Sequence, residues 1–464
     1  MQPLWTVAEI LAATGGRAEN LIDGPIASIS IDSREIGFRS LFVAIKGDAL
    51  DGHDFVPQAF AAGAAAALVS EARAASLGGQ NLIVVVDTLK ALEDLGRAAR
   101  ARNQGTIVAV TGSAGKTTTK EAIRTALTPS GQVHASIKSF NNHWGVPLML
   151  ARLPREAKFG VFEIGMNHPG EITPLVKLVR PHIAVVTTVA AAHLEFFDSV
   201  AGIAEAKAEI FLGLEPGGTA LLNADHDQLH ILFNRARKAG VVNVVTYGLD
   251  ETADWRISSI DVQPARTTAR VTHAGTTYAL SIAVPGRHMI ANATAALAVA
   301  SIAGEGTEAA IAALEQFSAP EGRGEMHRLG PATRPMLLID ESYNANIASM
   351  TAALEVYAPV KARGEKVLIL GDMLEMGVQS PQLHASLKDK VLAAGATKIF
   401  LIGPSMAALA AALDGAPVAG HANTVEELTE TILSGLAHGD SVMVKGSKGV
   451  RLAGLVKTIR DRFG

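Results

Sequence analysis

A glycine-rich segment with a lysine and a row of threonines, VAVTGSAGKTTTKEAI, occupies residues 108–123. Its apolar start predicts a buried strand that ends at Thr111, followed by a helix that begins near Lys116. Glycines let backbone N–H groups converge on an anion, and the helix N-terminus adds partial positive charge. A capped glycine turn is the structural alternative, but Gly-Lys-Thr after a buried strand favours phosphate binding. The predicted phosphate loop comprises Gly112, Ser113, Ala114, Gly115, Lys116, Thr117 and Thr118.

This loop is shorter than the common nucleotide-binding loop. The common pattern has a glycine five residues before the Gly-Lys pair, where this chain has Val110. The first glycine of the loop is Gly112 instead, which lies closer to Gly115. Lys116 would still offer a mobile cation to the terminal phosphates, and Thr117 a hydroxyl group to Mg²⁺. The short loop indicates a particular group of ATP-using proteins rather than a general kinase.

Other polar residues with possible roles in chemistry follow predicted strands or lie in predicted helices. Glu163 follows the apolar run GVF, where a carboxylate would lie at the carboxyl edge of a sheet, although a solvated strand end is an equal alternative. His193 follows VVTTV, and a single histidine there is more often structural. Lys207, in AEAKAEI, is by composition an ordinary solvated lysine. His288 and Asn292 are four residues apart and share one face of an expected helix.

The elements that must position these residues suggest three α/β domains. A chain of 464 residues exceeds a single core. Unalternating Val- and Ile-rich runs predict strands buried on both faces, whereas residues 255–284 alternate with period two and predict an antiparallel edge. The expected domains are residues 1–103, 104–318 and 319–464, with hinges near 103 and 320. An alanine-rich stretch, QAFAAGAAAALV, predicts a helix leading into a strand.

Composition excludes several classes of function. The net charge is −4 and the pI about 6.4, which disfavours bulk binding of nucleic acid. The chain has no cysteine, so thiolate catalysis and cysteine metal sites are excluded. Its first 16 residues make a poor signal peptide, and its longest apolar run, 289–303, is too short and too polar to span a membrane. We expect a cytoplasmic protein without a membrane span.

Several motifs, in order, resemble the Mur ligases, the ATP-dependent amide-forming family of peptidoglycan synthesis. The family loop reads G-x-x-G-K-T-[ST], which residues 112–118 match. SIDSREI and LFVAIKGDALDGHDF resemble the family's UDP-binding domain, and no DNPR-type signature of the diaminopimelate-adding members is present. NNHWGVP, DESYNANIASM and LGDMLEMG resemble the member that joins D-Ala-D-Ala to UDP-N-acetylmuramoyl-tripeptide. Two departures are Glu341, where an aspartate is usual, and Ile347, where a proline is usual.

The resemblance implies a fold and a reaction. The fold would be α/β with three domains: an N-terminal UDP-sugar-binding domain, a central P-loop-type, mostly parallel sheet with an antiparallel edge, and a C-terminal Rossmann-like ligase domain. A peptide carboxylate would attack the γ-phosphoryl group of ATP, and the amine of D-Ala-D-Ala would then displace phosphate from the acyl phosphate. Mg²⁺ would be the cofactor.

The resemblance also assigns roles to residues. Thr117, Glu163 and His193 would hold Mg²⁺, and Lys207 would carry a carbamate. Lys116, Lys207, His193 and Arg323 would be catalytic, with Arg323 reaching the ATP phosphates from the third domain. His288 and Asn292 would approach the adenine, and Asp340 the ribose. Residues 444–451 could receive the dipeptide carboxylate. Substrate contacts would come from Ser33, Arg34, Lys46, Asp48, Asn141, Asn142, Tyr343, Asn344 and Asn346.

Two alternatives remain open from the sequence. One is a related ligase that adds a single amino acid instead of a dipeptide. The other is a catalytically silent nucleotide-binding protein on the same fold, because fold alone does not establish activity. The intact Lys116, Thr117, Glu163 and Lys207 argue against the silent protein. We further expect a monomer whose third domain swings onto the second.

Overall fold

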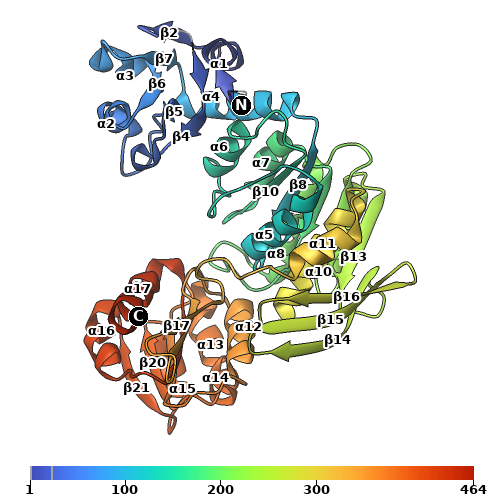
Figure 1. The fold of residues 1–464 in the computed structure, drawn as a ribbon, viewed down its shortest axis with the longest axis vertical. Helices are drawn as coiled ribbons and strands as arrows, with labels where there is room; N and C mark the ends of the chain where they lie inside the picture. The colour runs from blue at the N-terminus through green and yellow to red at the C-terminus, as the bar shows by residue number, and fades with distance from the viewer. Residues whose placement is uncertain (1–2, 22–23) are drawn as a thin grey trace.

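The computed structural model describes residues 3–21 and 24–464; Met1 and Gln2, the first residues of the segment assessed as a signal peptide, lie outside it. Three large sheets follow one another along the described chain and form the upper, middle and lower parts of the molecule in Figure 1. Each sheet alternates with helices. The predicted α/β class is therefore confirmed, as is the three-part organisation of the sheets. The exact domain boundaries stay a prediction.

The N-terminal part contains a five-stranded sheet in the order β2-β7-β6-β5-β4, parallel except for β2. A separate antiparallel pair joins β1 and β3. The strands are β1 (Trp5–Thr6), β2 (Arg17–Glu19), β3 (Pro25–Ile26), β4 (Ser28–Ser30), β5 (Ser40–Val43), β6 (Ala64–Ser70) and β7 (Leu82–Val85). The helices are α1 (Val7–Thr14), α2 (Val56–Ala61), α3 (Glu71–Ala74) and α4 (Thr88–Arg102), with 3-10 turns η1 (Ser33–Glu35), η2 (Gly52–Phe55) and η3 (Ala75–Leu77).

The alanine-rich stretch forms a helix that leads into a strand, as expected, although the helix takes up only its first few residues. Its helix, α2, ends at Ala61, and the alanines from Ala64 onward form strand β6. Gly63, at φ +103°, ends the helix in a conformation that favours glycine. β6 is then paired on both sides, with β5 and β7. Pairing and burial in the sheet outweigh the helix propensity of alanine, which is a weak preference.

The junction after the first sheet is tightly packed. Asp87 caps α4 by accepting hydrogen bonds from Leu89 N and Lys90 N, at 2.8 and 3.0 Å. Beyond the helix, Asn103 is buried, and its Nδ2 donates to the carbonyl groups of Pro154 and Ala157. The expected boundary at residue 103 is thus anchored to the central part of the chain rather than free.

The central part contains a nine-stranded sheet in the order β16-β15-β14-β13-β12-β11-β8-β10-β9. Pairs from β9 to β14 are parallel, and β14, β15 and β16 form the antiparallel edge that the period-two pattern predicted. The strands are β8 (Thr106–Thr111), β9 (Val133–Ala135), β10 (Phe159–Glu163), β11 (Ile183–Val186), β12 (Thr219–Asn223), β13 (Asn243–Gly248), β14 (Trp255–Gln263), β15 (Arg266–His273) and β16 (Thr276–Ile282).

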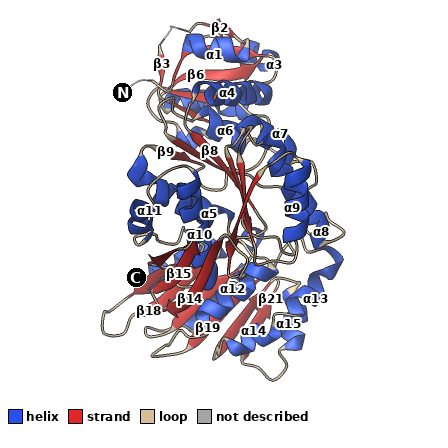
Figure 2. Ribbon diagram, turned by 90° about the vertical axis from the view of Figure 1, so that its right-hand side faces the viewer, coloured by secondary structure: helices blue, strands red, loops and turns tan. Residues whose placement is uncertain are grey.

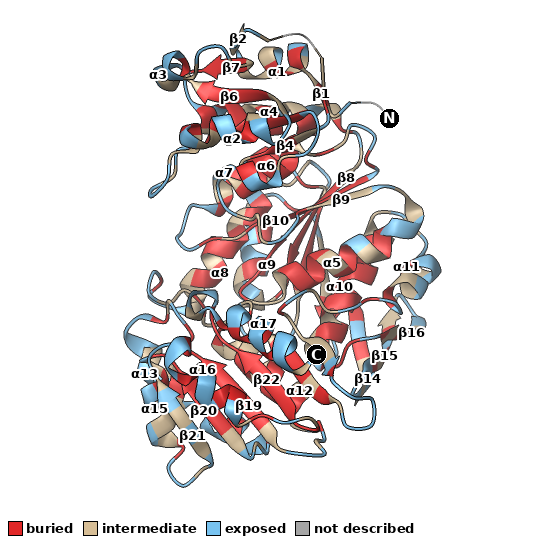
Figure 3. Ribbon diagram, turned by 60° about the vertical axis from the view of Figure 1, so that its left-hand side comes forward, coloured by how far each residue is buried: buried red, intermediate tan, exposed pale blue. Residues whose placement is uncertain are grey.

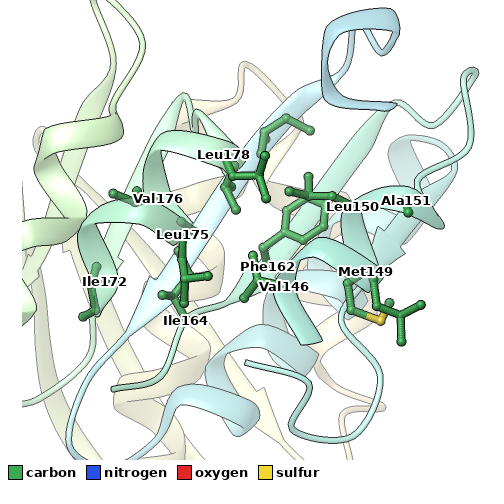
Figure 4. Packing of buried hydrophobic residues seen from close by; sticks show 14 of the residues in the cluster. Val146, Met149, Leu150, Ala151, Phe162, Ile164, Ile172, Leu175, Val176 and Leu178 are labelled. Atoms are coloured by element: carbon green, nitrogen blue, oxygen red, sulfur yellow. The ribbon is translucent and has the colours of Figure 1, made fainter. Parts of the chain in front are cut away.

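Helices cover both faces of this sheet, as Figure 2 shows. Ile107 and Ala109 of β8 belong to one buried cluster, and Val108 and Val110 to another, because successive side chains point to opposite faces. Figure 4 shows the first cluster, where Phe162 packs among side chains of α6 and α7. The helices are α5 (Lys116–Leu127), α6 (Gly145–Ala151), α7 (Ile172–Val179), α8 (Val200–Ala208), α9 (Leu229–Lys238), α10 (Arg287–Ile302) and α11 (Thr307–Leu314), with η4 (Thr128–Ser130) and η5 (Glu209–Gly213).

The C-terminal part contains a six-stranded sheet in the order β17-β18-β22-β19-β20-β21, parallel except for β17. Figure 3 shows its inner strands, among them β19, β20 and β22, buried between helices, whereas the edge strands β17 and β21 are more exposed. The strands are β17 (Glu325–Leu329), β18 (Met336–Glu341), β19 (Lys366–Gly371), β20 (Lys398–Ile402), β21 (Val418–Ala422) and β22 (Ser441–Lys445). The helices are α12 (Ile347–Tyr357), α13 (Ser380–Ala385), α14 (Lys388–Ala393), α15 (Met406–Ala412), α16 (Val425–Ser434) and α17 (Leu452–Phe463), with η6 (Gly377–Gln379) and η7 (Lys448–Val450).

None of the helices in residues 3–21 and 24–464 combines the length and apolar character that crossing a bilayer requires.

Candidate functional site

The predicted phosphate loop joins β8 to α5 at the carboxyl edge of the central sheet. β8 lies between β10 and β11, and the chain leaves it toward β9 and β10 on one side before returning to β11 on the other. Such a reversal of strand order opens a crevice where parallel sheets bind ligands. Gly115, at φ +82°, starts α5 in a left-handed conformation that favours glycine. The strand–turn–helix prediction is confirmed.

Close packing holds the loop in shape. A Cβ on Gly112 would lie 1.9 Å from Thr187 Oγ1, so only glycine fits there. Ser113 N donates to Thr188 O at 2.7 Å, and Thr187 Oγ1 donates to Ala114 O at 2.6 Å. Ser113 Oγ also donates to Ala190 O at 2.9 Å. The segment after β11 therefore fixes the loop before any ligand arrives.

Lys116 begins α5, and its Nζ donates to the carbonyl oxygen of Gly112 at 2.8 Å. Burial lowers the pKa of Lys116; Glu163 opposes this shift, and Arg323 adds to it. Arg323 belongs to the C-terminal part, so that part already approaches the phosphate loop. A phosphate group at the loop would favour the charged form of Lys116 and restore its usual protonation.

Glu163 ends β10 as a buried carboxylate. Its Oε2 accepts a 2.8 Å hydrogen bond from Thr117 Oγ1, and its Oε1 accepts one of 2.7 Å from Asn141 Nδ2. Both partners are neutral. A buried carboxylate without a cationic hydrogen-bond partner, beside a hydroxyl oxygen, has the hard oxygen donors that Mg²⁺ prefers. The residues present therefore fit a divalent cation at this point.

Asn142 makes its hydrogen bonds to the backbone at the start of α6, whereas Asn141 bonds to Glu163. The Oδ1 of Asn142 accepts hydrogen bonds from the backbone N–H groups of Trp144 and Gly145, at 3.3 and 2.9 Å. These bonds satisfy donors at the start of α6. The side-chain oxygen of Asn142 is therefore used within the chain, which leaves its Nδ2 as the group that can contact a ligand.

His193 follows β11 in a left-handed backbone conformation, at φ +57°. Its Nδ1 lies 2.5 Å from Oε2 of Glu375, in the C-terminal part. This hydrogen bond lowers the pKa of Glu375, although partial burial of the carboxylate opposes the shift. The predicted metal ligand is thus held by a carboxylate that is 182 residues distant in sequence.

Lys207 is buried on α8, contrary to the ordinary interpretation of a solvated lysine. Burial lowers its pKa well below the usual value, and nearby Lys116 lowers it further. No carboxylate contributes to this shift. The surroundings therefore favour a neutral amine, which is the form that reacts with CO₂ to give a carbamate. A carbamate would also replace repulsion from Lys116 with attraction, so the residues present fit this modification.

His288 and Asn292 lie on α10, as the spacing predicted. Burial lowers the pKa of His288. Asn292 is also buried, and a Cβ added to Gly115 would lie 3.0 Å from its Oδ1. Asn292 therefore packs directly against the phosphate loop.

The C-terminal part contributes Arg323 from the segment before β17, together with residues at and after the end of β18. The Arg323 guanidinium lies over the ring of Tyr343, 4.2 Å from its centroid. Asp340 is buried and accepts a 2.9 Å hydrogen bond from Ser342 N. Asn346 Nδ2 donates to Ser113 O in the phosphate loop at 3.1 Å. The start of α12 in the C-terminal part is therefore in direct contact with the phosphate loop of the central part.

These residues share one cleft of about 1680 Å³ between the central and C-terminal parts. Such a volume holds a nucleotide and more, since ligand pockets usually measure about 300–1,000 Å³. Gly112 and Lys207 lie outside its lining. The predicted residues that line it are Ser113, Ala114, Gly115, Lys116, Thr117, Thr118, Asn141, Asn142, Glu163, His193, His288, Asn292, Arg323, Asp340, Tyr343, Asn344 and Asn346.

The four predicted residues of the N-terminal part do not line this cleft. Ser33 Oγ donates to Gln58 Oε1 at 3.2 Å, and Arg34 pairs with Asp32 in its own turn at 2.6 Å. Lys46 and Asp48 are exposed in the loop after β5. A uridine diphosphate site at these residues stays a prediction, separate from the nucleotide cleft.

The sequence reasoning missed several residues of the site. Glu375 lies in the LGDMLEMG motif, but its pairing with His193 had no local signal. Lys120 is fully buried, and its Nζ donates to the carbonyl oxygen of Ser136. Asn223 ends strand β12 and Asp225 lies just beyond it, both in the cleft, and polar residues at the end of an apolar run were a signal for them. Lys445 lies in the predicted segment 444–451, but its burial and its pairing with Glu341 at 3.3 Å had no local signal.

Three family models match consecutive parts of the chain: the Mur ligase family catalytic domain at residues 25–126, the Mur ligase middle domain at 110–300, and the Mur ligase glutamate ligase domain at 322–448. The UDP-N-acetylmuramoyl-tripeptide–D-alanyl-D-alanine ligase of Escherichia coli (strain K12) is 35% identical over 452 residues, 95% of each chain. The chain belongs to the Mur ligase family.

Solved structures of the family agree over the whole length. MurF from Acinetobacter baumannii has a TM-score of 0.84 and 30% identity, covering 98% of this chain and 99% of that chain. MurF ligase from Thermotoga maritima in complex with ADP has a TM-score of 0.77 at 24% identity, covering 94% and 97%, and so supports the fold. The full-length likeness is to MurF members of the family, as the ordered motifs indicated.

Proposed function

We propose that this chain joins D-Ala-D-Ala to UDP-N-acetylmuramoyl-tripeptide, with ATP converted to ADP and phosphate, and so forms the pentapeptide precursor of peptidoglycan. The observation that carries the proposal is the phosphate loop facing Glu163, Arg323 and Asn346 in one cleft. Full-length similarity to the ligases described above supports the choice of substrates.

The first step brings two anions together, the peptide carboxylate and the γ-phosphoryl group of ATP. Lys116 and the loop N–H groups would offset part of that charge, and Arg323 would add a second cation from the C-terminal part. An acyl phosphate forms, and ADP leaves. The amine of D-Ala-D-Ala then attacks the acyl carbon and expels phosphate. Asn292 and His288 would border the adenine, and Asp340 the ribose.

Thr117, Glu163 and His193 would hold Mg²⁺. When bound, the ion supplies charge stabilisation at the phosphate oxygens and orients them. Glu163 would offer its carboxylate to the ion beside the hydroxyl group of Thr117. Asn141 would keep the other carboxylate oxygen in place through its 2.7 Å hydrogen bond. A carbamate on Lys207 would add an anion beside Lys116.

The remaining assignments complete the proposal. Ser33, Arg34, Lys46 and Asp48 would contact the uridine diphosphate. Asn142 would contact the muramyl peptide, and Tyr343 and Asn344 the dipeptide. We place the reaction in the cytoplasm, and a monomer suffices because one chain supplies the whole cleft.

A substrate comparison tests this function. Purified protein is incubated with ATP, Mg²⁺ and UDP-N-acetylmuramoyl-tripeptide, together with D-Ala-D-Ala, D-Ala or a diamino acid. Mass spectrometry should find the pentapeptide product with the dipeptide only. A product with a single amino acid would show the related ligase instead, and adenine nucleotide binding without any product would show the silent homologue.

A further inference from the structure

One residue of the C-terminal part contacts the segment after β11 with both its side chain and its backbone. Glu375 Oε2 lies 2.5 Å from His193 Nδ1, and Glu375 O accepts a 3.1 Å hydrogen bond from Glu195 N. Both His193 and Glu375 line the nucleotide cleft. The contact therefore connects the docking of the C-terminal part to the position of one imidazole ring in the cleft.

Both partners hold unfavourable backbone conformations to make this contact. His193 has φ +57° and Glu375 φ +62°, in the left-handed region that costs a residue other than glycine about 1 kcal/mol or more. Gly377 packs against the same segment, and a Cβ on it would lie 3.1 Å from the Cα of Glu195. Such local strain is typical of functional sites and needs surrounding contacts to maintain it.

The hydrogen bond also determines which ring nitrogen carries the proton. An ionised carboxylate only accepts hydrogen bonds, so Nδ1 of His193 must donate to Glu375. In the neutral ring, Nε2 then carries the free lone pair, which is the form that binds a metal. A carboxylate in this position generally fixes the tautomer and orientation of a metal-binding histidine.

We propose that Glu375 is a positioning residue for the divalent cation: it holds His193 with Nδ1 protonated and Nε2 available, so that docking of the C-terminal part completes the cation site of the central part. The inference rests on the Mg²⁺ role of His193 in the proposed function. The inference adds that tight binding of the cation requires the C-terminal part to be docked. When that part is swung away from the central part, the imidazole of His193 is no longer held in its orientation. Cation affinity and domain docking would then be coupled.

The test measures binding of Mn²⁺ to the full chain with a non-hydrolysable ATP analogue, by electron paramagnetic resonance. Glu375→Gln keeps the size of the side chain and removes its charge, and Glu375→Ala removes the contact. Glu195→Gln is the matched control, because Glu195 is exposed and contacts the loop only through its backbone. Nitrogen-15 spectra of protein with labelled histidine report the tautomer of His193. The signal of His193 is identified as the one that is absent from His193→Ala.

We expect Glu375→Gln and Glu375→Ala to weaken Mn²⁺ binding about 10-fold or more, whereas Glu195→Gln leaves it unchanged. The Nδ1–H signal of His193 should change to a mixture of tautomers in both Glu375 variants. Unchanged Mn²⁺ affinity and tautomer in those variants, with the nucleotide still bound, would overturn the inference and leave the proposed function intact. Wild-type protein that binds no Mn²⁺ with the nucleotide would overturn both.

Discussion

Asn346 donates a hydrogen bond of 3.1 Å from Nδ2 to the carbonyl oxygen of Ser113, in the phosphate loop. The same side chain caps α12, because its Oδ1 accepts a 2.9 Å hydrogen bond from Ser349 N. One buried amide thus connects the start of a C-terminal helix with the central loop. The orientation of the C-terminal part and the shape of the phosphate loop are therefore coupled.

Replacing Asn346 with aspartate should separate these two roles. Aspartate caps helices as well as asparagine does, but it has no donor for Ser113 O and would place a negative charge beside that carbonyl. We expect α12 to remain stable while kcat/KM for ATP falls about 10-fold, since the lost bond is worth about 1 kcal/mol and repulsion adds to it. Steady-state kinetics and X-ray scattering would measure activity and domain docking.

Ser349→Ala is the control for this substitution. It removes the other half of the capping box without touching the phosphate loop. Ser349→Ala should lower the free energy of unfolding by about 1 kcal/mol and leave the kinetics with ATP unchanged. Equal kinetic losses in Ser349→Ala and Asn346→Asp would mean that only the cap matters.

Lys120 should contribute to stability and to the order of the site. It is fully buried, its Nζ donates to the carbonyl oxygen of Ser136, and it pairs with Glu121 at 2.8 Å. Lys120→Met would leave these acceptors without their donor, at a cost of about 1–3 kcal/mol in the free energy of unfolding. Urea denaturation would measure the loss. Lys177→Met, at an exposed position on α7, should change it by less than about 0.5 kcal/mol.

The sequence predicted best those strands, turns and helices whose structure depends on neighbouring residues. Residues 106–127 form the expected strand, loop and helix, since glycine, lysine and threonine are required within a few positions of one another. The period-two pattern likewise located β14, β15 and β16. Hydrophobic periodicity and turn chemistry act over the same short range that they describe.

Features that depend on contacts between residues distant in sequence could not be predicted from local patterns. The sequence predicted a strand after the alanine-rich helix but not where it begins, because the alanines of β6 become a strand through pairing with β5 and β7. Lys207 had the composition of a solvated lysine, and its burial depends on how α8 lies against the sheet. Glu375 became part of the site through a contact with His193, 182 residues away. No local pattern carries this information, so family resemblance alone pointed to Lys207 and His193.

Lys207 should react with CO₂ at neutral pH. Burial and Lys116 lower its pKa well below the usual value, so the neutral amine is available where an exposed lysine would be protonated. Intact mass spectrometry under mild conditions should find one CO₂ adduct, lost on acidification. Lys207→Ala should lose the adduct and most of the activity, and small carboxylic acids should restore part of that activity. An adduct that persists in Lys207→Ala would place it elsewhere.

The stability of the central part should decrease below neutral pH because of His134. Burial lowers its pKa from 6.5 to about 4, although a hydrogen bond with Met149 O opposes the shift. The unfolded chain therefore binds a proton first, so the stabilisation present above pH 6.5 is lost as the pH falls toward 4. This histidine accounts for at most about 3 kcal/mol. Urea unfolding at pH 7, 6 and 5 should show a smaller decrease in His134→Gln, and an identical decrease would exclude the assignment.

The central claim is that a carboxylate takes the terminal phosphoryl group of ATP in the cleft between the phosphate loop and Arg323. Oxygen-18 in the terminal carboxylate of the UDP-N-acetylmuramoyl-tripeptide tests it most directly. With ATP, Mg²⁺ and D-Ala-D-Ala, mass spectrometry should find one labelled oxygen in the released phosphate and the other in the amide of the product. Phosphate free of label, with product still formed, would contradict the acyl-phosphate route.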